Sequence, residues 1–500
     1  MKDKKKIKYN LIVGIAGQLI ALVLGVMVPK LVLDHYGSEV NGLLSSVTNI
    51  YAYISIVEAG IAAAACQALY KSIAQKDQKQ TNAVLAATNK YYQRTGAIYL
   101  GLIILFAALY PVFIQTDIPY ATIVLVILFN GLGNVVNYFF HGKYLILLKA
   151  DGKNYIRAGL EIFTNTFKQI SKIILISIGY DVVAVQFTAM MASLVQMIYI
   201  SYYIQKHYSW IDLSVRPDLA SISQSKHVFV HEINYMISAN IDTILLTFFS
   251  TLKVVSVYSL YALLYSIIER TLRSVKEAFE FKLANEYYRN REVFLKFFEA
   301  YETYYITIAF ALLTIINIFI SPFLKIYTYG ITDANYIDPY LPYLFTFIHL
   351  LSSGRYPSDA MVHIAGHFQQ TKKSATIETL INLIMSVILV RVAGIYGVLA
   401  GTAICSMYRT NYLIFYANKK IVLRKAFKTY KCWGVNFGIY VLIMCLSHKS
   451  TISATSYFQL LAVFIPYSLG VISIYLTVIS ISKPQSFRYI VSLLRKSKTS

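Results

Sequence analysis

The sequence is poor in charge and in cysteine. Only 14% of its 500 residues are charged and 57% are hydrophobic, whereas soluble domains carry about 25% charged residues. Its four cysteines (Cys66, Cys405, Cys432 and Cys445) have no paired spacing, so they predict neither a disulfide framework nor a metal motif. Long apolar runs recur along the whole length instead. They indicate a multi-pass membrane protein rather than a large soluble enzyme.

The sequence also lacks the motifs of common enzymes. It has no phosphate-binding glycine loop, no nucleophile elbow and no pair of catalytic carboxylates on an outside loop. Two histidine pairs have the i, i+4 spacing of zinc ligands, His227/His231 and His363/His367, but only Glu232 stands nearby as a third ligand. We therefore expect no enzyme activity and neither a metal nor an organic cofactor.

Fourteen segments are candidates for membrane-spanning helices, each of which needs about 20 residues. They are 11–33, 43–70, 97–114, 120–140, 156–179, 182–204, 229–250, 254–275, 303–324, 340–363, 376–393, 397–417, 433–447 and 457–481. The first follows a lysine-rich tail and has no small-residue cleavage site, so we expect a retained span and not a signal peptide. The weakest candidates are 433–447, which is short, and 156–179, which is very polar.

The net charge of +22 has a topological explanation. Most of the 46 basic residues fall in alternate connections between the candidate spans, which the positive-inside rule places in the cytoplasm together with both termini. The outside connections are short; the longest, 325–339, has no room for a folded domain. The charge therefore suits anionic lipid head groups, and we expect no nucleic-acid partner.

A faint internal repeat divides the chain. Residues 40–45 read VNGLLS and residues 254–259 read VVSVYS, an offset of 214 residues or six spans. An even number of spans gives both halves the same orientation, as in parallel-repeat transporters whose substrate site lies between the halves. We therefore expect an N-terminal lobe over 1–226 (spans 1–6), a C-terminal lobe over 227–431 (spans 7–12), and spans 13 and 14 with a basic cytoplasmic tail over 432–500.

The segment 156–179 carries the strongest constellation of polar residues. Arg157, Glu161, Asn165, Lys168 and Lys172 follow helical spacing, so they form one stripe on a helix. A spanning helix must turn such a stripe toward protein or water. The stripe therefore either lines a polar cavity or divides, with Glu161 and Lys168 pairing with neighbouring helices and Arg157 and Lys172 reaching toward the two membrane faces.

Three carboxylates inside candidate spans are candidates for ion coupling: Glu58, Glu161 and Asp242. An ionised side chain at the bilayer centre costs roughly 2.5 to 3.5 kcal/mol on insertion scales. One interpretation is that Glu58 and Asp242 are buried and either neutral or paired with an arginine. The other is that they act in a proton- or cation-linked switch, with H⁺ or Na⁺ as the coupling ion.

Four further cations lie in or beside candidate spans. Arg355 precedes Tyr356 and Pro357, where we expect a helix break. Arg273 and Arg409 lie toward the cytoplasmic ends of their spans, where they could also reach the head groups. Lys30 lies at the outer end of the first span. Together with Lys168 and Lys172, these are the candidate substrate-binding cations.

Two stretches, 36–71 and 238–261, resemble the polysaccharide-exporting branch of the multidrug/oligosaccharidyl-lipid/polysaccharide (MOP) exporter superfamily. The matching motifs are YGSEVNGL at Tyr36–Leu43, EAGI at Glu58–Ile61 and LYK at Leu69–Lys71. The resemblance implies an all-α polytopic membrane protein with a V-shaped MOP flippase fold. About 14 transmembrane helices are then expected, 12 in two six-helix lobes plus 2.

The resemblance also implies a function. The chain would be a flippase that moves undecaprenyl-diphosphate-linked oligosaccharide repeat units, such as those of O-antigen or capsule, from the inner to the outer leaflet of the bacterial plasma membrane by alternating access. The candidate cations Lys168, Lys172, Arg355, Arg273, Arg409 and Lys30 would bind the diphosphate and sugar. Expected partners are the lipid-linked oligosaccharide, membrane lipids, and a polysaccharide polymerase and glycosyltransferases.

Two other classes stay open. A cation-coupled drug or small-molecule antiporter of the same superfamily should have an acidic and aromatic cavity, whereas the polar residues here are mixed to basic. An integral-membrane polysaccharide polymerase needs a sizeable outside loop with catalytic residues, and the sequence has none.

Overall fold

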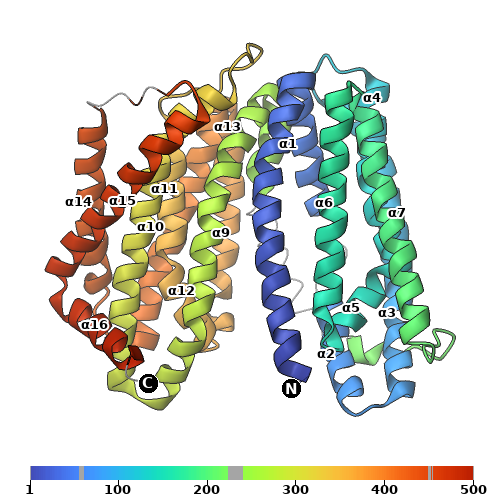
Figure 1. The fold of residues 1–500 in the computed structure, drawn as a ribbon, viewed down its shortest axis with the longest axis horizontal. Coiled ribbons are helices and arrows are strands. Elements are labelled where there is room, and N and C mark those ends of the chain that lie inside the picture. Colours follow the sequence, from blue (N-terminus) through green and yellow to red (C-terminus); the bar gives the residue numbers. More distant parts are fainter. Residues whose placement is uncertain (1, 56–60, 223–239, 449–451, 453, 499–500) are drawn as a thin grey trace. The chain divides into compact units, whose positions relative to one another are not determined.

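The computed structural model describes residues 2–55, 61–222, 240–448, 452 and 454–498, and every regular element in these residues is a helix (Figure 1). The chain forms two compact units, Met1–Ser256 and Val257–Ser500. The lobe boundary expected after residue 226 lies outside the described residues, so the expected domain limits stay predictions.

Unit 1 begins with the longest helix of the chain, α1 (Lys2–Ile54), which has a kink at Gly37 with a φ of 80°. This positive φ suits glycine, and it lets one continuous element contain the first expected span and the beginning of the second. The other elements of unit 1 are α2 (Ile61–Ala74), α3 (Gln78–Phe113), α4 (Tyr120–Val136), the π-helix η2 (Asn137–His141), α5 (Gly142–Ala150), α6 (Asn154–Ile178), α7 (Val182–His207), the 3₁₀ helix η3 (Ala220–Ile222), the helix Asn240–Phe249 and the first turn of α9 (Leu252–Arg289).

The VNGLLS motif of unit 1 packs α1 against the first turn of α9. Asn41 Nδ2 donates a hydrogen bond of 2.7 Å to Ser256 Oγ of α9. Directly after the motif, Ser46 Oγ lies 2.6 Å from Thr247 Oγ1 of the helix Asn240–Phe249. A Cβ on Gly42 would lie 1.9 Å from the carbonyl oxygen of Leu252, so no larger residue fits there. The motif thus marks a close backbone contact between helices.

Unit 2 consists of the rest of α9, α10 (Arg291–Tyr327), α11 (Leu341–Gly354), α12 (Tyr356–Ile364), α13 (Phe368–Tyr416), the π-helix η4 (Ala417–Val422), α14 (Phe427–His448), α15 (Tyr457–Ser482) and α16 (Pro484–Lys498). α10 lies at its centre and packs against α11, α14 and α15. α13 is kinked at Gly394, where φ is 54°, and this kink separates the two expected spans 376–393 and 397–417. The expected helix break at Arg355 is confirmed, because α11 ends at Gly354 and α12 begins at Tyr356.

The elements recur at a constant distance along the chain, as the sequence repeat predicts. α5 and α12 each have 9 residues, and their first residues, Gly142 and Tyr356, are separated by the predicted offset. The same offset separates the first residues of α6 and α13. Gly152 and Gly366, which precede these two helices, both have a φ of 70°. The chain is therefore an internal duplication, and α14 to α16 follow the second copy.

Eight helices in the described part of the chain are long and apolar enough to cross a membrane. They are Gln78–Phe113, Tyr120–Phe140, Val182–His207, Leu252–Arg289, Arg291–Tyr327, Gln369–Val422, Phe427–Ser447 and Tyr457–Ser482. The last two confirm the expected spans 13 and 14 as helices. α6 has the necessary length at 25 residues, but it carries four charged side chains: Arg157, Glu161, Lys168 and Lys172.

Candidate functional site: buried charges in both units

Four members of the polar stripe of α6 are half-buried, and the fifth, Asn165, is exposed. α6 packs against α1 and α7, and Lys168 Nζ donates a hydrogen bond of 2.8 Å to Ser193 Oγ of α7. The opposite flank carries Phe163, which is 62% exposed, and Phe167, which is 46% exposed. In a membrane protein, this apolar flank faces lipid. Lys168 thus contacts a neighbouring helix, whereas the surface that the stripe as a whole faces stays a prediction.

The members of the stripe differ in how they are neutralised. Arg157 Nη1 lies 3.0 Å from Glu161 Oε1, so these two residues pair along their own helix rather than with a neighbour. Lys168 has a hydroxyl as its partner, and Lys172 is half-buried and has no hydrogen-bond or ion-pair partner among the described residues. Two lysines without a carboxylate partner among the described residues therefore lie one helical turn apart on α6.

The other candidates of unit 1 are distributed around it. Asp242 lies in the helix Asn240–Phe249, is only 8% exposed, and acts electrostatically on Tyr53 of α1. Lys30 Nζ lies 2.6 Å from Asp34 Oδ1, which neutralises it within α1. Glu58 lies outside the described residues.

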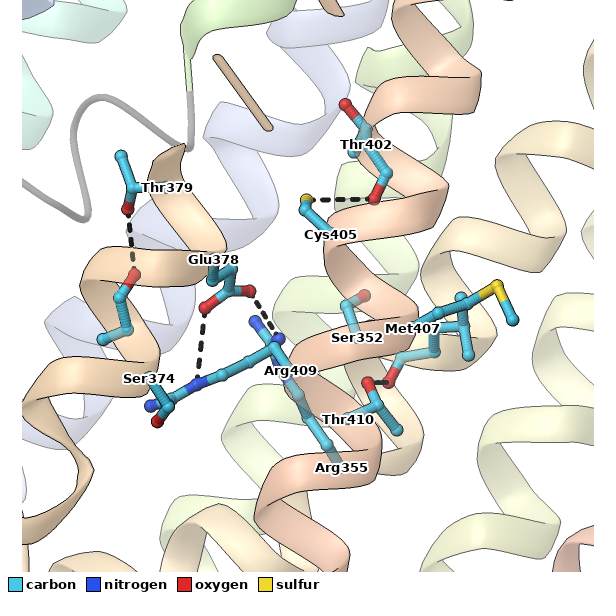
Figure 2. Close-up of polar contacts among 12 residues, drawn as sticks. Ser352, Arg355, Ser374, Glu378, Thr379, Thr402, Cys405, Met407, Arg409 and Thr410 are labelled. Carbon is cyan, nitrogen blue, oxygen red and sulfur yellow. Dashed lines mark hydrogen bonds and ion pairs between the residues drawn. The ribbon is translucent and has the colours of Figure 1, made fainter. Parts of the chain in front are cut away.

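Unit 2 contains an arginine–glutamate–arginine triad. Arg355 Nη1 lies 2.6 Å from Glu378 Oε1, and Arg409 Nε lies 3.3 Å from Glu378 Oε2. Figure 2 shows the two guanidinium groups converging on the carboxylate. Arg409 also donates to Ser374 Oγ and, at 3.3 Å, to the backbone carbonyl of Thr371. The three charged side chains are between 11% and 22% exposed, so burial makes their mutual pairing essential.

A second group of charges continues from the triad toward α9. Lys276 Nζ lies 2.7 Å from Asp359 Oδ2, and this aspartate also interacts electrostatically with Arg355. Earlier in α9, Arg273 Nη2 lies 3.0 Å from Glu269 Oε1. The same glutamate oxygen accepts a hydrogen bond from the hydroxyl of Tyr356. The charged cluster of unit 2 thus joins α9, α12, α13 and Arg355, which lies between α11 and α12.

Around Glu378 this charged cluster has more positive than negative charge. Its Lys and Arg ion pairs join four cations (Arg273, Lys276, Arg355 and Arg409) to three carboxylates (Glu269, Asp359 and Glu378), and a fourth carboxylate, Glu280, lies 3.9 Å from His363, which also contacts Asp359. Three of the predicted binding cations, Arg273, Arg355 and Arg409, belong to it, but each is already paired. The excess arises at Glu378, because one carboxylate serves two guanidinium groups.

Sequence reasoning did not single out Asp359 and Glu378. Both are acids inside expected spans, 340–363 and 376–393, so the criterion that selected Asp242 would also have found them. The histidine pair at 363 and 367 separates in the structure. His363 Nε2 lies 3.7 Å from Asp359 Oδ1, whereas His367 Nδ1 lies 2.9 Å from the hydroxyl of Tyr416.

Duplicated helical units that bury charged side chains among apolar spanning helices define a polytopic membrane transporter. The sequence profile of the polysaccharide biosynthesis protein family matches residues 4–277, which is more than half of the chain, and the chain belongs to this family. The resemblance found in the sequence is thereby confirmed. No curated protein sequence matches the chain significantly.

Solved structures with the same fold are similar at low sequence identity. The lipid II flippase MurJ in an inward closed conformation aligns with a TM-score of 0.69 and 14% identity, over 95% of this chain and 99% of that one. An inward-facing multidrug resistance MATE family transporter of the MOP superfamily aligns with a TM-score of 0.67 and 16% identity, over 80% and 95%. The all-helical MOP fold expected from the sequence is therefore confirmed.

Proposed function

We propose that this protein flips undecaprenyl-diphosphate-linked oligosaccharide repeat units from the inner to the outer leaflet of the bacterial plasma membrane. The observation that carries the proposal is positive charge without a matching carboxylate among the described residues: the half-buried Lys168 and Lys172 in unit 1 and the triad around Glu378 in unit 2. A diphosphate is a compact dianion that lysine and arginine bind through charge-assisted hydrogen bonds. Family membership supports a polysaccharide-related substrate.

The residues have distinct roles in this proposal. Lys168 and Lys172 are the first donors to the diphosphate, because they lose no carboxylate partner among the described residues when they bind it. Arg355 and Arg409 share Glu378, so an incoming phosphate can take one guanidinium while the carboxylate keeps the other. Arg273 remains with Glu269, and Lys30 with Asp34.

Alternating access of the two units around the bound head group would carry the substrate across, as in other transporters with parallel repeats. Because the cell interior is negative, outward movement of negative charge is favourable by about 2.3 kcal/mol per charge per 100 mV. The sequence has no ATPase motif. Coupling to H⁺ or Na⁺ through Glu58, Glu161 or Asp242 would add to this driving force.

The second candidate function is drug or cation antiport, which the MATE-like fold supports. Excess cations among the buried charges favour an anionic substrate over a cationic drug. The MurJ alignment also covers more of this chain than the MATE alignment does. In the proposed setting, a polysaccharide polymerase and glycosyltransferases act beside the protein, both termini are cytoplasmic, and the product serves a capsule or an O-antigen.

The experiment measures how much lipid-linked oligosaccharide reaches the outer face of cells that lack the protein and every other flippase for this substrate. A membrane-impermeant probe of the sugar should find it in cells complemented with the wild-type chain and not in the deletion strain. K168Q/K172Q should reduce exposure at least tenfold. The matched control K372Q/K373Q removes the same charge from two exposed lysines of α13 and should leave exposure unchanged. Equal exposure in the deletion strain and the complemented strain would overturn the proposal.

A further inference from the structure

A second basic site lies at the turn between η4 and α14, away from the charged cluster of unit 2. The turn lines a pocket of about 590 Å³. The wall of this pocket combines three cations with three large apolar side chains: Lys419, Arg424, Lys425, Phe415, Leu423 and Phe427. No carboxylate from the described part of the chain lines it. The composition suits a ligand that has an anionic group and an apolar part.

Ion pairs and hydrogen bonds of buried side chains hold the backbone of this turn in place. Arg424 is only 9% exposed at its side chain and pairs with Glu302, which is 2% exposed. Its Nε donates 2.6 Å to Asn418 Oδ1, and Thr429 donates 2.8 Å to the same glutamate. Arg291 donates to the carbonyls of the last two η4 residues. The pocket is therefore preformed, so the protein loses little conformational entropy when a ligand binds.

The charged side chains of two lysines at the pocket, Lys419 and Lys425, are available to bind a ligand. Lys419 and Lys425 are exposed, and neither side-chain ammonium group has an ion-pair or hydrogen-bond partner among the described residues. Lys428, one turn into α14, differs because it pairs with Glu299 at 3.0 Å. The charge of Arg424 is neutralised by its ion pair with Glu302. The net positive charge that faces the pocket therefore comes from Lys419 and Lys425.

The apolar half of the wall is exposed to an unusual degree. Phe427 is 71% exposed, Leu423 70% and Phe415 57%. Three such side chains around one pocket would be costly in water and are favourable where lipid covers them. The positive-inside pattern places this connection at the cytoplasmic face, at the level of the lipid head groups. Leu423, which follows the last residue of η4, has a positive φ of 55°.

We infer that this pocket binds an anionic phospholipid of the cytoplasmic leaflet. Lys419 and Lys425 hold its phosphodiester, and its acyl chains run along Phe415 and Phe427. Charge complementarity selects an anionic over a zwitterionic head group, and the exposed apolar wall selects a lipid over free phosphate. The bound lipid braces the turn that connects the duplicated helices to α14. This site is independent of the flipping proposal.

The test uses the purified full-length protein in a neutral detergent. The thermal unfolding midpoint is measured during titration with phosphatidylglycerol, phosphatidylcholine or inorganic phosphate. Phosphatidylglycerol should raise the midpoint of the wild type, and the other two should not. For K419Q/K425Q, half-maximal stabilisation should require roughly ten- to thirty-fold more phosphatidylglycerol, because each lysine near an anionic surface contributes about 1 kcal/mol.

Two comparisons separate a specific pocket from general surface charge. K372Q/K373Q removes the same charge elsewhere and should respond to phosphatidylglycerol like the wild type. A426W fills the pocket at constant charge and should weaken the response as K419Q/K425Q does, because Ala426 also lines the pocket. Equal responses of the two double variants would overturn the inference. So would equal stabilisation by phosphatidylcholine or by inorganic phosphate.

Discussion

The Nη1 atom of Arg355 lies 2.6 Å from Oε1 of Glu378, and this ion pair joins the helix break after α11 to the first half of α13. Arg355 occupies the break because Pro357 follows it, and a helix cannot continue unperturbed through that proline. Arg355 is thus the residue between α11 and α12, and its side chain reaches Glu378 of α13.

Removing the shared carboxylate should cost more stability than removing either arginine. E378Q leaves Arg355 and Arg409 buried side by side without a counter-charge, which should lower the free energy of unfolding by about 3 kcal/mol or more. R355Q and R409Q each leave one intact pair with Glu378, so each should cost about half as much or less. Thermal unfolding in detergent measures the order. If R355Q proves as damaging as E378Q, the carboxylate does not serve both arginines.

The ion pair of Arg424 and Glu302 should be a strong structural contact of unit 2. R424Q leaves a carboxylate that is 2% exposed without its cation, so we expect a loss of about 3 to 5 kcal/mol. K428Q breaks the neighbouring exposed pair with Glu299 and should change stability by no more than about 0.5 kcal/mol. Thermal unfolding of both variants checks the contrast. Similar losses would show that burial does not determine the contribution of these pairs.

Much of the fold follows from the sequence, because apolar length and alternating positive charge are local properties. The repeat offset, the break at Arg355 and the last two helices were all predicted. The pairing of charges was not, since it depends on contacts between residues distant in sequence. Glu378 pairs with Arg409 because the kink at Gly394 folds α13 back on itself. Helical spacing alone does not predict such a contact.

Gly42 should tolerate no side chain. In G42A the new Cβ would meet the backbone carbonyl of Leu252 at 1.9 Å, and a backbone atom cannot move aside as a side chain can. We expect a loss of several kcal/mol or failure to fold. G25A in the same helix is the matched control, because nothing lies within 4 Å of its Cβ position. The comparison measures the purification yield and the thermal unfolding midpoint of both variants. A wild-type midpoint for G42A would contradict the close contact between α1 and α9.

Because of Lys143, the free energy of unfolding of unit 1 should rise at alkaline pH. It lies in α5, outside the spanning helices, is 7% exposed, and donates 3.1 Å to the carbonyl of Phe140. Burial lowers the pKa of Lys143 from 10.5 to about 8. Because the unfolded chain binds this proton more tightly than the folded chain does, the charged lysine penalises folding below pH 8. The penalty disappears as the pH rises from about 8 to 10.5. K143M keeps the apolar stem and removes the titration, so its stability should exceed that of the wild type at pH 7 and approach it at pH 10. Unfolding midpoints across this range provide the measurement, and parallel pH profiles for the two proteins would refute a depressed pKa at Lys143.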